Sequence, residues 1–94
     1  MPSIIVRHKA ADFDKWFPMY KEHATARKAA GSQGARAFRN TDDPNEIFVL
    51  TEWPTLESAK AFAHSDNLRE TMQKAGIVEK PDVFFVEEVE KTPF

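Results

Sequence analysis

The sequence predicts an α+β fold in which a four-stranded antiparallel sheet carries its helices on one face, with elements in the order β-α-β-β-α-β. Branched and aromatic residues form four short runs typical of strands, and between them apolar residues recur at the helical intervals of three and four. Clusters of turn-forming residues separate these segments. The chain has 94 residues, of which 41% are hydrophobic and 30% charged, so we expect one globular domain over residues 1–94.

The first strand and the first helix are predicted within the first third of the chain. Ser3–Lys9 begins with branched apolar residues, a composition typical of a strand. Asp12 can cap the helix that follows, and Gly31 can end it because glycine adopts positive φ easily. Pro18 lies inside this stretch and lacks a backbone N–H, so we expect either a kink or a loose first turn over Phe13–Phe17.

The rest of the chain predicts a hairpin, two helical pieces and a last strand. Gly34–Asn40 and Glu46–Trp53 flank a dense cluster of turn residues, so they should pair as antiparallel strands, the first of them at a sheet edge. Thr55 can cap a second helix, and Asn67 with Glu70 resembles a capping box for a third. These helices and the last strand are expected at Leu56–His64, Leu68–Ala75 and Asp82–Val89.

The strands are apolar on both faces, although the helices can cover only one. Consecutive strand residues point to opposite faces, and apolar residues are consecutive in Ile4–Val6, Ile47–Leu50 and Val83–Val86. Pairing two uncovered faces of roughly 350 Å² each would gain about 17 kcal/mol gross, against an association cost of about 4–15 kcal/mol. We therefore expect a homodimer paired face to face; the alternative is that loops and the Pro93–Phe94 tail cover the second face.

These features resemble the dimeric α+β barrel superfamily. The resemblance rests on the ferredoxin-like element order, the doubly apolar strands and the segment Glu52–Ser65, in which a Trp ends the third strand and an Ala/Phe-rich helix ends at a Ser-Asp break. More narrowly, the chain resembles the small proteins grouped with antibiotic-biosynthesis monooxygenases. The resemblance implies that two sheets close into a dimeric α+β barrel, with a pocket between sheet and helices in each protomer.

The same resemblance implies an activity. It is the cofactor-free oxygenation or cyclisation of an aromatic, polyketide-like molecule whose own anion reacts with oxygen, so no cofactor is expected. Haem-degrading relatives carry a Trp and a His where this chain has Phe62 and Met72, which argues against a haem site.

One stripe of the first helix carries groups suited to a ligand. Trp16, Tyr20, His23 and Arg27 follow one another at steps of four, three and four, so they share one side of the helix. Together they offer an aromatic surface, a phenol, an imidazole and a cation, which suits a planar, phenolic or carboxylated ligand. The alternative is that Trp16 and Tyr20 fill the core while His23 and Arg27 lie at its solvent edge.

His8, Trp53 and Arg39 are further candidates. His8 is either a pocket group near a sheet end or a satisfied edge residue, and Trp53 either a stacking wall or a structural residue. Arg39 either reaches an anionic ligand or protects an edge strand from aggregation. For an enzyme we assign the base to His23 or His8 and the orienting donor to Tyr20. Convergence of these three on one cavity of about 300 Å³ or more would favour ligand handling.

Composition and missing motifs exclude several classes of protein. The absence of cysteine excludes disulfides and thiolate sites and fits a cytoplasmic location, and a net charge of −2 gives no indication of a nucleic-acid partner. No apolar run is long enough to span a membrane, and no signal peptide or metal-ligand motif occurs, so no metal is expected. The expected partners are a second copy and a small aromatic or hydrophobic ligand; the functional alternative is a non-catalytic ligand-binding or stress-response dimer.

Overall fold

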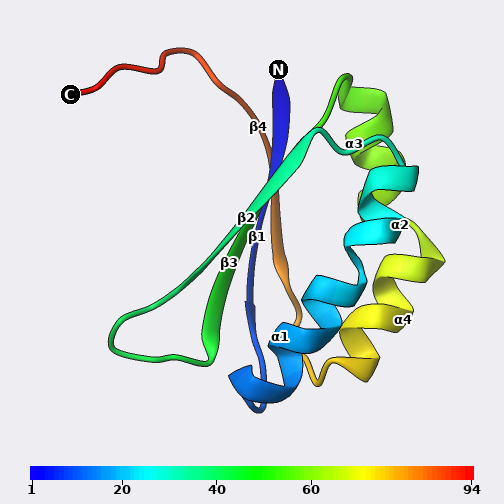
Figure 1. Cartoon of the computed structure of the whole chain (residues 1–94), viewed down its shortest axis with the longest axis vertical. Coiled ribbons are helices and arrows are strands. Elements are labelled where there is room, and N and C mark those ends of the chain that lie inside the picture. The colour runs from blue at the N-terminus through cyan, green and yellow to red at the C-terminus, as the bar shows by residue number, and fades with distance from the viewer.

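An antiparallel sheet with helices against one of its faces makes up the computed structural model, which describes residues 1–94 (Figure 1). The strands are β1 (Pro2–Lys9), β2 (Gly34–Arg39), β3 (Glu46–Glu52) and β4 (Asp82–Glu87). The helices are α1 (Phe13–Glu22), α2 (Ala24–Ala29), α3 (Leu56–Ala63) and α4 (Asp66–Lys74). The strand order is β2-β3-β1-β4 with every neighbouring pair antiparallel, which confirms the predicted ferredoxin-like α+β fold and the edge position of β2.

The core lies between the sheet and the helices and is divided into two clusters. In one, Ile4 and Val6 of β1 pack with Trp53, Ala59 and Phe62. In the other, five residues pack together: Ala10, Trp16, Ile47, Val49 and Ala75. The alternation of buried and less buried residues along β1 and β3 puts these side chains on the face that the helices cover.

The helix predicted from the first stripe breaks at His23 and not at Pro18. Asp12 caps α1 as predicted, because its side chain accepts a hydrogen bond from the Asp14 N–H at 2.9 Å. Pro18 lies within α1, where the carbonyl that loses its partner belongs to exposed Asp14 and can bind water instead. His23 has ψ of −7° and starts a second short helix, α2.

The cap of α4 also differs from the prediction. Ser65 caps this helix, its hydroxyl accepting from the Leu68 N–H at 3.2 Å, so α4 begins at Asp66 and Asn67 lies in its first turn. Gly31 and Gly76 follow the ends of α2 and α4 with φ of 108° and 81°, the left-handed conformation that stops a helix.

The other face of the sheet is apolar and uncovered. Phe38 and Phe84 on this face are 52% and 54% exposed, and Leu50 and Phe84 each lie opposite Ile5 in the strand register. The tail does not cover it, since Phe94 is fully exposed and Figure 1 shows the C-terminal segment leading away from the sheet. A single copy therefore leaves this face bare.

Candidate functional site

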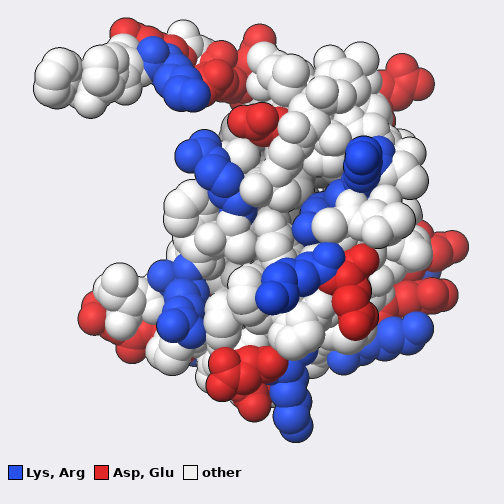
Figure 2. Space-filling model, viewed as in Figure 1, with Lys and Arg blue, Asp and Glu red and all other residues white.

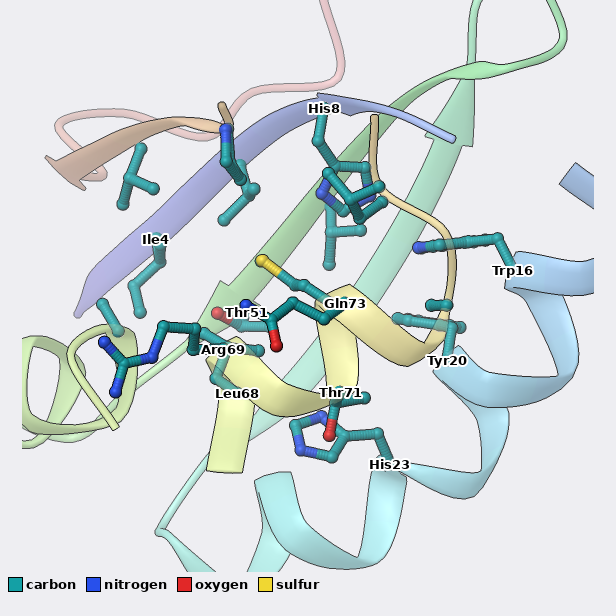
Figure 3. A pocket seen from close by; sticks show the side chains of 18 of the residues that line it. Ile4, His8, Trp16, Tyr20, His23, Thr51, Leu68, Arg69, Thr71 and Gln73 are labelled. Atoms are coloured by element: carbon teal, nitrogen blue, oxygen red, sulfur yellow. The ribbon is translucent and has the colours of Figure 1, made fainter. Parts of the chain in front are cut away.

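A cavity of about 440 Å³ lies between the inner face of the sheet and the helices, at the boundary of the two core clusters. β1 and β3 form its floor with residues such as Val6, Val49 and Thr51, and α1 forms one wall. α4 lies over it with Leu68, Met72 and neighbouring side chains (Figure 3). Because most of these side chains are apolar, the few polar groups among them decide what can bind.

A continuous aromatic wall lines one side of the cavity. The rings of Trp16 and Tyr20 stack with centroids 5.0 Å apart and planes 15° from parallel. The His8 ring meets the edge of Trp16 at 5.6 Å, and the guanidinium of Arg27 lies 4.2 Å from the Tyr20 ring centroid. The helical stripe predicted from the sequence therefore lines the cavity, with the stacked rings of Trp16 and Tyr20 between His8 and Arg27.

His8 is buried in the cavity floor without a hydrogen-bond partner. Its side chain is on the helix-covered face of β1 and the residue is 3% exposed, yet neither ring nitrogen contacts a donor or acceptor. Desolvation lowers the pKa of His8 to about 4, so the ring is neutral at neutral pH and offers one N–H donor and one nitrogen acceptor. A buried polar group left unpaired costs about 1–3 kcal/mol, which a ligand with an oxygen at this point would offset.

His23 lies at the rim and is held by α4. Its Nε2 atom is 2.6 Å from Oδ1 of Asn67, and its ring packs 5.8 Å from that of Phe62. With the Asn67 amide oxygen as the acceptor, Nε2 is the donor of this contact, and Nδ1 has no partner in the protein. Figure 3 shows His23 beside Thr71, well apart from His8. Both histidines line the same cavity, but they do not meet at one point.

Arg27 contributes a buried positive charge to the cavity lining. The residue is 8% exposed, and its Nη1 atom donates to the Tyr20 carbonyl at 2.9 Å. Desolvation lowers the pKa of the guanidinium from its usual value, although arginine remains a cation at any physiological pH. No carboxylate of the chain forms a salt bridge with it.

Trp53 and Arg39, two of the predicted ligand contacts, do not line the cavity. Trp53 is fully buried, stacks on Phe62 at 4.8 Å and donates from Nε1 to the Thr51 hydroxyl at 2.8 Å, so it belongs to the core. Arg39 lies on the exposed edge strand with its guanidinium 4.4 Å from the Phe13 ring centroid. Neither residue is part of the site described here.

Several lining residues were not singled out from the sequence. Thr51 is one, although its alternation with Val49 along β3 places it on the inner face. Thr71 and Gln73 of α4 are others, and polar residues on a short helix give no signal that distinguishes a cavity wall from a solvated face. The position of α4 over the sheet is what brings them to the site.

Figure 2 shows acidic and basic groups interspersed over this side of the molecule, with no single basic patch. No group of three or more His, Cys, Asp or Glu side chains is placed to hold a metal ion. None of the helices has both the length and the apolar character needed to cross a bilayer.

Comparisons with known proteins give a family and a fold. A family model described as "Antibiotic biosynthesis monooxygenase" matches residues 7–74. A search of curated proteins finds no match. A solved structure described as an antibiotic biosynthesis monooxygenase is similar with a TM-score of 0.75 and 16% identity, covering 96% of this chain and 100% of the other.

Two further solved structures share the fold at low sequence identity. SnoaB, a cofactor-independent oxygenase from Streptomyces nogalater, has a TM-score of 0.77 and 10% identity, with 99% of this chain and 97% of the other covered. A conserved protein from Methanosarcina mazei Go1 has a TM-score of 0.75 and 11% identity, with coverage of 93% and 91%.

Proposed function

Because the chain belongs to the antibiotic biosynthesis monooxygenase family, we propose that it binds a small aromatic molecule in the cavity and catalyses its cofactor-independent oxygenation or cyclisation. The observation that carries the proposal is a mainly apolar cavity of about 440 Å³ whose lining includes His8, Tyr20 and His23. A cavity of this size accommodates a small fused-ring molecule, and its walls exclude water from a reactive carbanion. The oxygenase activity named for SnoaB is consistent with this chemistry.

The residues of the cavity support a division of roles. His23 is the proposed base, because Asn67 fixes its ring and leaves Nδ1 free to take a proton. Tyr20 is the proposed orienting donor, and Trp16, which stacks on Tyr20, is the proposed aromatic wall beside the ligand. His8 is the weaker candidate for the base, since a nitrogen with a pKa of about 4 has little affinity for a proton. It serves instead as a neutral hydrogen-bond partner.

The proposed oxygenation needs no external electron source. Deprotonation of a phenol or an activated methylene gives a substrate anion that supplies the electrons to O₂. A methylene then becomes a carbonyl, one oxygen atom enters the product and the other leaves as water. The protein orients the substrate and excludes solvent, as the stacked wall and the apolar floor allow.

The proposed functional unit is a homodimer paired through the uncovered sheet face. Apolar side chains of all four strands form this face: Ile5, Phe38, Phe48, Leu50, Phe84 and Val86. A bare apolar patch of this extent is typical of an interface. Pairing through it leaves the cavity, on the opposite side of the sheet, open to a ligand.

A non-catalytic ligand-binding dimer is the second candidate. The low pKa of His8 and its distance from His23 favour it, because the two imidazoles do not form a joint acid and base. In this case the cavity would bind the same class of molecule without turning it over.

Oxygen uptake separates the two candidates. Wild-type protein and an anthrone-type phenol in an oxygen electrode should give uptake with one oxygenated product by mass spectrometry. His23→Ala should lower the rate by about a hundredfold or more, in the range of a lost general base. His64→Ala is the control, because His64 caps the C-terminus of α3 outside the cavity. Saturable binding without uptake would refute the oxygenase and favour the second candidate.

A further inference from the structure

Arg27 is a buried cation that the chain leaves without an anion. Only Nη1 has a hydrogen-bond partner, the Tyr20 carbonyl, and the face of the Tyr20 ring provides the remaining favourable contact. The other N–H groups of the guanidinium have no acceptor in the protein. Unlike the nitrogens of His8, these groups are not sealed from solvent, so they can donate to an anionic ligand group that enters the cavity.

His8 and Arg27 lie toward opposite ends of the cavity. His8 pairs with Ile47 in the sheet register, whereas Ile4 pairs with Thr51 at the other end of the cavity floor. Arg27 belongs to α2, and the loop after α2 is joined to this second end by the hydrogen bond from Gln33 N–H to the Glu52 carbonyl, 2.7 Å long. The four residue-to-residue steps of extended strand from Ile4 to His8 span about 13 Å.

The group at each end has its own chemistry. The guanidinium binds a carboxylate through parallel N–H···O bonds. The neutral imidazole of His8 both donates and accepts, which matches a hydroxyl or carbonyl group and not a second charge. Arg69 and Lys80 also line the cavity, but both are exposed and Arg69 forms a salt bridge with Asp66, so Arg27 is the cation shielded from solvent.

We propose that the ligand is a planar aromatic carboxylate with a neutral hydroxyl or carbonyl group at its far end. The carboxylate binds Arg27, the rings pack between the pair of Tyr20 and Trp16 and the apolar side chains of the cavity floor, and the neutral oxygen contacts His8. This inference rests on the proposed function only in that the cavity must bind a small molecule; it requires no turnover.

Three small aromatic probes test the two ends of the proposed ligand separately by titration calorimetry under nitrogen. The probes are 6-hydroxy-2-naphthoate, 2-naphthoate, which lacks the hydroxyl, and 6-hydroxy-2-naphthamide, which lacks the charge. We expect the amide to bind at least about tenfold more weakly than the hydroxynaphthoate, as for a lost charge-assisted hydrogen bond. We expect 2-naphthoate to bind about fivefold more weakly, as for a lost neutral one. Equal affinity for acid and amide would overturn the proposal even if no variant were made.

Variants assign each difference to its residue. Arg27→Met should abolish the preference for the acid over the amide, and His8→Phe should abolish the preference for the hydroxylated acid. Arg39→Met is the matched control, because its guanidinium also lies on an aromatic ring but outside the cavity. If Arg39→Met lost the preference for the acid over the amide, or if Arg27→Met kept it, the assignment of the carboxylate to Arg27 would be refuted.

Two further measurements keep the outcomes distinct. Circular dichroism establishes that each variant is folded, and if Arg27→Met is not, Arg27→Lys should keep part of the acid preference because it keeps the charge. If binding depends on the carboxylate and the hydroxyl as described but no oxygen is taken up, the ligand class is supported and only the oxygenase is refuted. Oxygen uptake with an aromatic substrate, together with equal binding of acid and amide, supports the oxygenase and refutes the ligand class.

Discussion

The buried imidazole of His8 should make the stability of the protein depend on pH. Its pKa is about 4 in the folded chain and 6.5 in the unfolded chain. Between these values the unfolded state binds more protons, so the free energy of unfolding falls as the pH falls from about 6.5 toward 4. Evaluating the two-state linkage between pH 7.5 and pH 5 gives a loss of about 2 kcal/mol from this one residue.

Urea unfolding measures the effect directly. Wild-type protein and His8→Phe are unfolded at pH 7.5 and at pH 5, at one fixed protein concentration because dimerisation would couple to folding. The wild type should lose about 2 kcal/mol more than the variant. At pH 7.5 the variant should be at least as stable as the wild type, since it removes two unpaired buried nitrogens.

A control variant excludes a general effect of acid. His64→Gln should keep the pH dependence of the wild type, because His64 is not part of the unpaired buried site. Parallel pH curves for the wild type and His8→Phe would refute the view that His8 is buried neutral. The view would also be refuted if the free energy of unfolding of the wild type, measured relative to His8→Phe, were higher at pH 5 than at pH 7.5.

The remaining predictions concern the uncovered face, the core and one helix end. Phe84→Asp should turn a dimer into a monomer in sedimentation velocity at micromolar concentration, whereas the same change at Leu56, an exposed residue of α3, should not. A wild type that sediments as a monomer would refute the pairing. Trp53→Ala should lower the free energy of unfolding by about 3–5 kcal/mol in urea titrations, because a fully buried indole and its bond to Thr51 are lost. Gly31→Ala should cost about 1 kcal/mol by the same assay because its φ is 108° with no atom near the new methyl group, and no change would refute conformational strain as the cause.

The positions of the strands along the chain and their two apolar faces were predictable, because both follow from local sequence patterns. Consecutive apolar residues in Ile47–Leu50 indicate that a strand has no polar face, and the structure puts Ile47 and Val49 inside and Leu50 on the uncovered side. The turn cluster before them predicted the β2–β3 hairpin, which the register confirms. These signals depend on neighbouring residues alone.

The stripe on the first helix was predictable for the same reason, and its break was not. Steps of four, three and four place Trp16, Tyr20 and Arg27 on one side whether or not the helix is continuous. At the break, the imidazole of His23 is held by Asn67 of α4, a helix far along the chain. A residue 44 positions away leaves no trace in the local pattern.

The environment of each polar group was the least predictable feature. A histidine at the end of an apolar strand face is compatible with a satisfied edge residue or with a pocket group, and only the packing around His8 decides that both nitrogens are unpaired. Trp53 shows the reverse case. Its position after β3 fits a pocket wall, but Phe62 and Thr51 enclose it completely.

The division of the interior into two clusters has a thermodynamic consequence. A compound that occupies the space between them touches both and so completes an interior that the chain itself leaves open. Present at a hundred times its Kd, it would add about 2.7 kcal/mol to the free energy of unfolding. For a domain whose total stability is on the order of 5–15 kcal/mol, this gain is large enough to raise the melting temperature clearly. Thermal-shift screening of aromatic acids therefore identifies which compounds bind in the cavity without an activity assay.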